Sequence, residues 1–70
     1  MFDHEALKLL MEYRGLSDAE LAQLVDVSES AIYKWRNGQR APQPRHYAQL
    51  VAALRVPPGY FFRRKKEVAA

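Results

Sequence analysis

The stretch from Ser17 to Gly38 reads SDAELAQLVDVSESAIYKWRNG and predicts two short helices joined by a tight turn. Ser17 and Glu20, three residues apart, form the pattern of a capping box, in which each side chain accepts a hydrogen bond from the other's backbone N–H. Ser28 is a second candidate N-cap residue. Gly38 stands where the left-handed C-terminal cap of a helix favours glycine. Each expected helix end therefore has a physical cause.

Apolar residues recur at helical spacing inside both expected helices. The helix over about residues 18–25 has one apolar face, formed by Leu21, Ala22 and Val25. In the helix over about residues 29–37, Ile32 and Trp35 are three residues apart and share a face that we expect in the core. The apolar side chain of Val27 is expected to fill the space inside the turn between the two helices. This is a helix-turn-helix arrangement, whose second helix characteristically enters the DNA major groove.

Three further helices are expected around this motif. One covers about residues 4–14, with Asp3 as its cap and Gly15 as its stop, and Leu7 and Leu10 are its best core anchors, with Met11 or Leu9 beside them. Another begins near Pro44, whose missing N–H is tolerated in a first helical turn. Its apolar face has the i, i+3, i+4, i+7 spacing, with Tyr47, Leu50, Val51 and Leu54. Pro57-Pro58 is expected to stop it and to start a last short helix through residues 60–62.

These residues carry a resemblance to a known family. The chain resembles the lambda repressor-like (Cro/Xre-type) DNA-binding domains of phage and bacterial regulators over roughly residues 5–62. The resemblance rests on Gly15-Leu16-Ser17, Ala19-Glu20-Leu21-Ala22, Val27-Ser28, Ile32, Trp35, Asn37-Gly38, Leu50, Ala53-Leu54, Val56 and Tyr60-Phe61-Phe62. It implies a compact all-α five-helix domain with a central helix-turn-helix, and a Cro-like repressor that binds a specific double-stranded DNA sequence. We expect this domain over residues 1–62 and a basic flexible tail over residues 63–70.

Charge is divided unevenly along the chain. Residues 1–32 hold seven acidic and two basic residues, a net charge of −5, whereas residues 33–70 hold nine basic and one acidic residue, a net charge of +8. The basic part begins in the middle of the expected recognition helix, which suggests that contact with a polyanion is concentrated on one side. The chain has no cysteine, no signal-peptide pattern and no apolar run that could span a bilayer. We expect a cytoplasmic, nucleoid-associated protein without a membrane partner.

Five residues are candidates for contacts with the bases. In the resembling family, positions matching Ser28, Glu29, Ser30 and Lys34 commonly read base edges. Lys34 could donate to guanine and Glu29 could accept from cytosine N4, while the outward-facing Tyr33 could pack on a thymine methyl group. Other interpretations stay open, because Glu29 also stabilises a helix N-terminus without DNA and Lys34 could be a solvated lysine.

A second set of residues is expected to contact phosphates, which position a DNA-binding domain without reading sequence. The candidates are Asn37, Arg40, Arg45, Arg36, Gln39 and Gln23. The basic segment of residues 63–66 could add non-specific affinity or could only keep the neighbouring aromatic residues soluble.

The sequence departs from the family's pattern in four ways, the last of which concerns the pair of positions held by Met11 and Arg36. Asp18 stands where members often have a neutral donor facing a phosphate, so that contact is in doubt. Asp26 and Arg55 replace glycines that members often have in left-handed positions, at a cost of order 1 kcal/mol for the latter. The frequent ion pair between the first helix and the end of the recognition helix is missing, which leaves Arg36 free to face DNA or Glu12.

A protein-interaction or antitoxin module of the same fold is the alternative function, since the acidic first two helices suit a basic protein partner. Tyr60, Phe61 and Phe62 could form a dimer contact, with one or two of the rings in the core. Because one such module contacts few base pairs, useful specificity suggests a homodimer, at least on DNA, at a palindromic operator. His4 and His46 match no metal-ligand spacing, and no nucleophile motif is present. We expect no catalytic residue, cofactor or metal.

Overall fold

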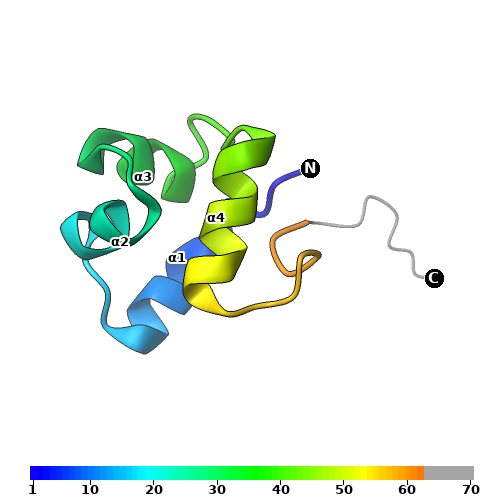
Figure 1. Cartoon of the computed structure of the whole chain (residues 1–70), viewed down its shortest axis with the longest axis horizontal. Helices are drawn as coiled ribbons and strands as arrows, with labels where there is room; N and C mark the ends of the chain where they lie inside the picture. The colour runs from blue at the N-terminus through cyan, green and yellow to red at the C-terminus, as the bar shows by residue number, and fades with distance from the viewer. Residues whose placement is uncertain (63–70) are drawn as a thin grey trace.

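Four α-helices form the described part of the chain, residues 1–62 of a computed structural model: α1 (His4–Arg14), α2 (Asp18–Val25), α3 (Glu29–Arg36) and α4 (Pro44–Leu54). Helices α2 and α3 pack closely together, and α1 and α4 complete the bundle (Figure 1). The all-α class expected from the sequence is confirmed, and the bounds of α1 and α2 are those expected. Helix α3 ends one residue earlier than expected. The expected tail over residues 63–70 lies outside the described residues.

The predicted caps form the ends of the helices. Ser17 Oγ accepts a hydrogen bond from the Glu20 N–H at 3.1 Å, and Glu20 Oε1 accepts one from the Ser17 N–H at 2.9 Å, which completes the capping box of α2. Ser28 Oγ accepts from the Ala31 N–H at 3.1 Å and caps α3 in the same way. These bonds satisfy N–H groups that a helix start leaves without partners. The helix-turn-helix is therefore fixed by local signals.

Two of the family departures occupy left-handed backbone positions, as the sequence predicts. Asp26 has φ 62° in the turn after α2, and Arg55 has φ 57° at the end of α4. Neither is a glycine, so each keeps a backbone conformation that L-residues rarely adopt.

The Arg14 guanidinium donates to the Leu54 carbonyl at 2.5 Å, which ties the end of α1 to the end of α4.

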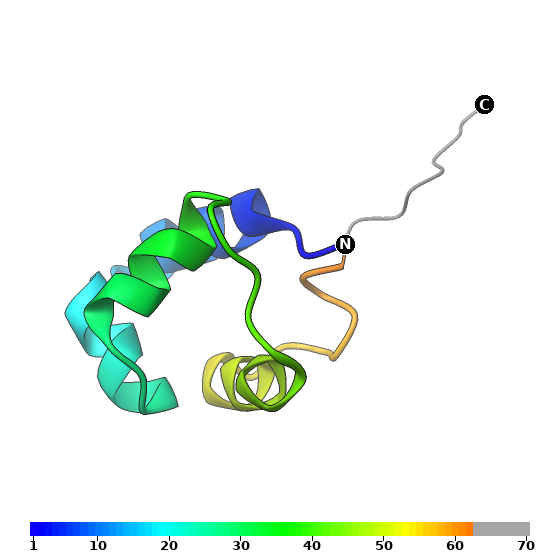
Figure 2. The ribbon, with the colours of Figure 1, turned by 90° about the horizontal axis from the view of Figure 1, so that it is seen from above.

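The prediction of a fifth helix is wrong. The Tyr60 N–H donates to the Pro57 carbonyl at 3.0 Å and the Phe62 N–H to the Gly59 carbonyl at 3.1 Å, so the segment forms turns. Two consecutive prolines supply no N–H donors, and the chain then turns back to the N-terminus. Phe62 forms an isolated antiparallel bridge with Phe2, and the first residues and the last described residues therefore lie together (Figure 2).

The core lies where all four helices meet. Its buried members are Leu7, Leu10, Met11, Leu21, Ala22, Val25, Ile32, Trp35, Leu50, Leu54 and Phe61. Of the two side chains considered beside Leu10, Met11 is buried and Leu9 is exposed. Phe61 is fully buried, so the C-terminal turn closes the core although it is not helical. None of the described helices is long and apolar enough to cross a membrane.

Candidate nucleic-acid interface

Helix α3 is anchored by its apolar face. Ile32 and Trp35 are buried, as their spacing predicts, and this fixes the rotation of the helix about its own axis. The opposite face is turned to solvent. It presents four of the five predicted base-reading residues, Glu29, Ser30, Tyr33 and Lys34, and Ser28 is exposed directly before the helix.

A groove of about 390 Å³ lies between α3 and the start of α4. It is lined by Ser28, Ser30, Ala31, Lys34, Trp35, Arg40, Ala41, Gln43 and His46. Three predicted base readers and one predicted phosphate contact therefore meet in one surface feature, although they come from a helix cap, a helix and a loop. Glu29 and Tyr33 do not line this groove.

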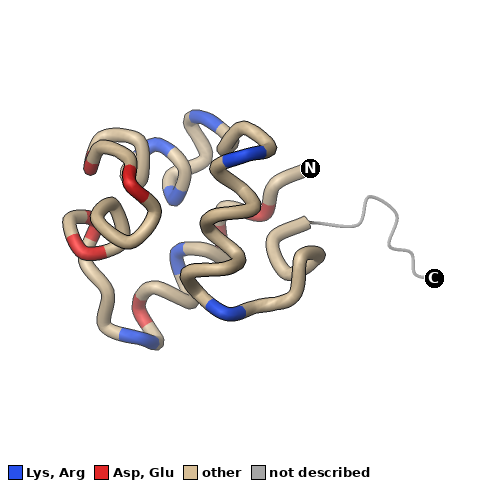
Figure 3. Tube along the Cα trace, in the orientation of Figure 1, with Lys and Arg blue, Asp and Glu red and all other residues tan. Residues whose placement is uncertain are grey.

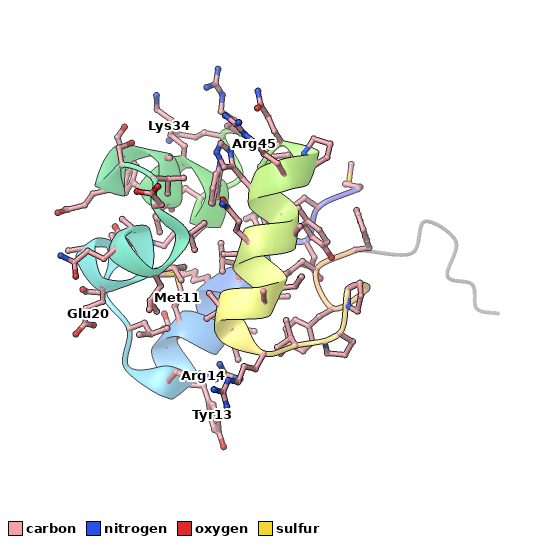
Figure 4. All side chains as sticks on the ribbon, in the orientation of Figure 1. Met11, Tyr13, Arg14, Glu20, Lys34 and Arg45 are labelled. Carbon is pink, nitrogen blue, oxygen red and sulfur yellow. The ribbon has the colours of Figure 1, made fainter. Side chains whose placement is uncertain are left out.

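Several basic residues gather around the end of α3 and the start of α4. Lys34 on α3 and Arg45 on α4 point to the same side in Figure 4. In Figure 3, basic positions follow the end of α3, the loop after it and the start of α4, whereas acidic positions lie mainly on α2, the turn after it and the start of α3. Arg40 and Arg45 are exposed. A local basic cluster thus lies around the end of α3, the following loop and the start of α4, while other basic positions, among them Arg14, lie at the opposite end of the molecule (Figures 3 and 4).

Several candidate contacts already have intramolecular partners. The Asn37 side-chain amide donates to the Tyr33 carbonyl at 2.9 Å and closes the end of α3. The Arg36 guanidinium carbon lies 5.2 Å from the centre of the Tyr33 ring, within the range of a cation–π contact. The Gln39 N–H donates to the Lys34 carbonyl at 2.9 Å, so the loop folds back on α3. Gln23 is exposed on α2.

The expectation that Arg36 is free to face DNA is wrong, whereas Glu12 does lie near it. Its guanidinium makes two hydrogen bonds to the Asp18 carboxylate, Nε to Oδ1 at 2.7 Å and Nη2 to Oδ2 at 3.0 Å. The hydrogen bond that Arg36 donates to Asp18, together with the Asp18 charge, raises the pKa of Arg36, which burial partly opposes. The nearby Glu12 charge also raises this pKa. The departure at Asp18 thus supplies an ion pair between α2 and α3. This pair neutralises the carboxylate that was expected to weaken a phosphate contact at the start of α2.

The three C-terminal aromatic residues have different environments. Phe61 is fully buried and is not available to a partner, whereas Tyr60 and Phe62 are 43% and 55% exposed.

Sequence reasoning treated His46 only as a possible metal ligand and did not consider Gln43 at all, yet both line the groove. Gln43 is the cap residue directly before α4 and His46 is the third residue of that helix, so both stand next to the predicted phosphate contact Arg45, which was a usable signal.

Comparison with known proteins decides the family. A model of the family HTH_3, described as helix-turn-helix, matches residues 7–61. The chain belongs to this helix-turn-helix family. Among solved structures, the restriction-modification controller protein C.AhdI from Aeromonas hydrophila is similar, with a TM-score of 0.78 and 29% sequence identity over 84% of this chain and 89% of that chain. No curated protein matches the chain significantly.

Membership of the helix-turn-helix family makes the chain a DNA-binding transcriptional regulator. Regulators of this kind are typically not enzymes. Within residues 1–62, no group of three or more His, Cys, Asp or Glu side chains is arranged to hold a metal ion.

Proposed function

We propose that this helix-turn-helix regulator binds a specific double-stranded DNA sequence with α3 in the major groove. The observation that carries this proposal is the exposed polar face of α3, which continues into a basic groove on the same side as Arg40 and Arg45. Recognition helices of this motif contact base edges with their N-terminal residues. In α3 these are the cap Ser28 and the first two helical residues, Glu29 and Ser30.

Within this arrangement some side chains contact base edges and others contact phosphates. Lys34 donates to guanine O6 or N7, Glu29 accepts from cytosine N4, and Ser30 contacts either groove edge. Tyr33 packs on a thymine methyl group or donates to a phosphate. The phosphates are contacted by Arg40, Arg45, Asn37 and Gln39, with Gln23 as a further contact. Arg36 contacts a phosphate only when its ion pair with Asp18 breaks. No catalytic step is needed for this function, and no cofactor enters it.

The regulator acts as a homodimer on a palindromic operator, as a repressor in the manner of Cro. A single module reads few base pairs, and two copies would place their α3 helices about one helical turn apart. Exposed Tyr60 and Phe62 are candidate contacts between the copies. Similarity to a restriction-modification controller protein also supports transcriptional control as the role. Cytoplasmic location, on the nucleoid, follows from this function.

The proposal is tested by selecting bound sequences from a random duplex pool at near-physiological salt. An enriched palindrome would establish sequence-specific binding and give the half-site spacing, and thus the dimer geometry. Weak binding that enriches no sequence and disappears as salt rises would overturn operator recognition. In that case the acidic residues of α2 and of the turn after it become the place to look for a basic protein partner.

Replacing Lys34 with alanine tests base reading. We expect Lys34→Ala to weaken binding to the selected operator by about 1–3 kcal/mol and to relax the sequence requirement at one position, because a lysine on a base edge discriminates between bases. The measurement is the Kd for the operator and for each single-base variant at that position. A uniform loss on all sequences would make Lys34 a phosphate contact instead.

Replacing Arg40 with alanine tests phosphate contact. We expect Arg40→Ala to weaken binding to every sequence similarly and to reduce the slope of log K against log salt by about one, since each neutralised phosphate releases counterions. Arg55→Ala is the matched control, because Arg55 follows the opposite end of α4 from Arg45. Equal slopes for Arg40→Ala and the unmodified protein would remove Arg40 from the interface.

A further inference from the structure

The groove between α3 and the start of α4 is suited to an oxyanion. Lys34 reaches it from α3 and Arg40 from the following loop, and the hydroxyl groups of Ser28 and Ser30 lie along the same lining. Its lining, all of it within the described part of the chain, contains no carboxylate. Two cations and two hydroxyl donors in one concave surface match the charge and the acceptor atoms of a phosphate group.

His46 gives this groove a titratable group. It is the third residue of α4, it is half-buried, and its ring lies 5.8 Å from the ring of Trp35 at an interplanar angle of 40°. Because Trp35 is itself buried in the core, it gives the imidazole a fixed wall. The ring is therefore held in the groove wall, on the side of the molecule that bears Lys34.

The groups that face His46 come from three elements. They are Lys34 on α3, Arg40 in the loop and the neutral Gln43 at the cap of α4, whereas Arg45 precedes His46 in the chain but does not line the groove. Gln43 makes no side-chain hydrogen bond to the first turn of α4. All the charged neighbours are cations, so an anion that enters the groove brings the negative charge that a protonated imidazole needs.

We propose that the groove receives one DNA backbone phosphate on its loop and α4 side, beside Arg40 and His46, while Lys34, Ser28 and Ser30 on its α3 side face the bases, and that His46 takes up one proton from solvent as the phosphate enters. This inference rests on the proposed DNA-binding function and adds a contact residue and a proton to it. An opposite charge within a few ångströms favours the charged form of an imidazole. Binding to DNA is therefore linked to protonation of His46, and affinity rises as pH falls through the range in which histidines titrate.

The size of the effect is limited by the number of protons. Uptake of one proton changes the binding constant by at most about tenfold per pH unit for each copy of the chain. We expect a several-fold tighter complex at pH 6 than at pH 8 per copy, at constant salt. Because a phosphate contact carries no sequence information, the effect is the same on the operator and on an unrelated duplex.

The experiment measures the Kd of the whole chain for a mixed-sequence duplex of two helical turns, by fluorescence anisotropy at low and constant salt, between pH 6 and pH 8. The protein, His46→Gln and His4→Gln are compared. Glutamine keeps a hydrogen-bond donor but does not titrate. We expect His46→Gln to lose the pH dependence while it still binds at pH 8, and His4→Gln to keep the pH dependence.

A second measurement needs no substitution. The Cε1–H signals of the two histidines are titrated by NMR in the free protein and in the complex, and only the His46 signal is expected to titrate at higher pH in the complex. An unchanged His46 titration, or a pH dependence that survives in folded His46→Gln, would overturn the inference while DNA binding stands. Failure to bind any duplex at low salt at any pH would instead overturn the proposed function.

Discussion

The ion pair between Asp18 and Arg36 should stabilise the packing of α2 against α3. We expect a double-mutant cycle of Asp18→Ala, Arg36→Ala and the double variant to give a coupling free energy of about 1 kcal/mol, at the upper end of the range for exposed pairs. Each single variant also loses other interactions. Asp18 lies in the first turn of α2, where a carboxylate favours the helix dipole, and Arg36 contacts the Tyr33 ring. The cycle cancels these separate losses.

The expected magnitude comes from the geometry. Opposite charges about 4 Å apart attract by about 4 kcal/mol at an effective dielectric constant of 20 and by about 1 kcal/mol in bulk water. The Arg36 and Asp18 side chains are 28% and 23% exposed, so part of their attraction is offset by lost hydration. Two parallel hydrogen bonds with a fixed guanidinium favour the pair over an ordinary surface contact.

The assay is urea unfolding at pH 7, with thermal unfolding as a second readout. A loss of 1 kcal/mol lowers the Tm of a domain of this size by about 4–8 °C. A parallel cycle of Asp18→Ala with Arg45→Ala is the control, since Arg45 is not bonded to Asp18, and its coupling should be zero. The effects of mutations at distant sites are additive to within about 0.3–0.5 kcal/mol. A coupling free energy between Asp18 and Arg36 that differs from zero by no more than this would refute the assignment of a stabilising pair.

Two other substitutions test the packing by urea unfolding. Phe61→Ala should destabilise the domain by about 3–5 kcal/mol, because it removes a fully buried aromatic ring, and a loss below about 1 kcal/mol would mean that the C-terminal turn does not close the core. Gly38→Ala should cost more than Gly15→Ala. Both glycines have positive φ, 77° and 67°, but only at Gly38 would the added Cβ meet the His4 ring, at 2.9 Å; equal losses for the two variants would contradict this steric account.

Local signals explain why most of the fold could be predicted from the sequence. A cap acts on the N–H groups within three residues of it, so Ser17 with Glu20, and Ser28, are visible as patterns and form the predicted bonds. Periodicity likewise shows which face of a helix is apolar, and both Ile32 and Trp35 are buried. The orientation of α3, on which the candidate interface depends, follows from these local facts alone.

Features that depend on the relative placement of distant segments were not predicted. Asp18 and Arg36 are eighteen residues apart and meet only because α2 and α3 cross at this point. The prolines at positions 57 and 58 are compatible with the first turn of a helix. The segment forms turns instead, because Phe62 pairs with Phe2 at the other end of the described chain. His46 stands beside Trp35 for the same reason. No pattern within one segment contains these contacts.

Helix α3 is too short to be stable by itself. It has eight residues, and isolated helices below about 12–15 residues are marginal in water. Ile32 and Trp35 hold one face in the core, while Asp18 bonds Arg36 at its last residue. The side chains proposed to face DNA are thus positioned by contacts on the opposite face and at the end of the helix. Loss of DNA binding in a variant therefore identifies a contact residue only when unfolding measured on the same variant shows that α3 is still packed.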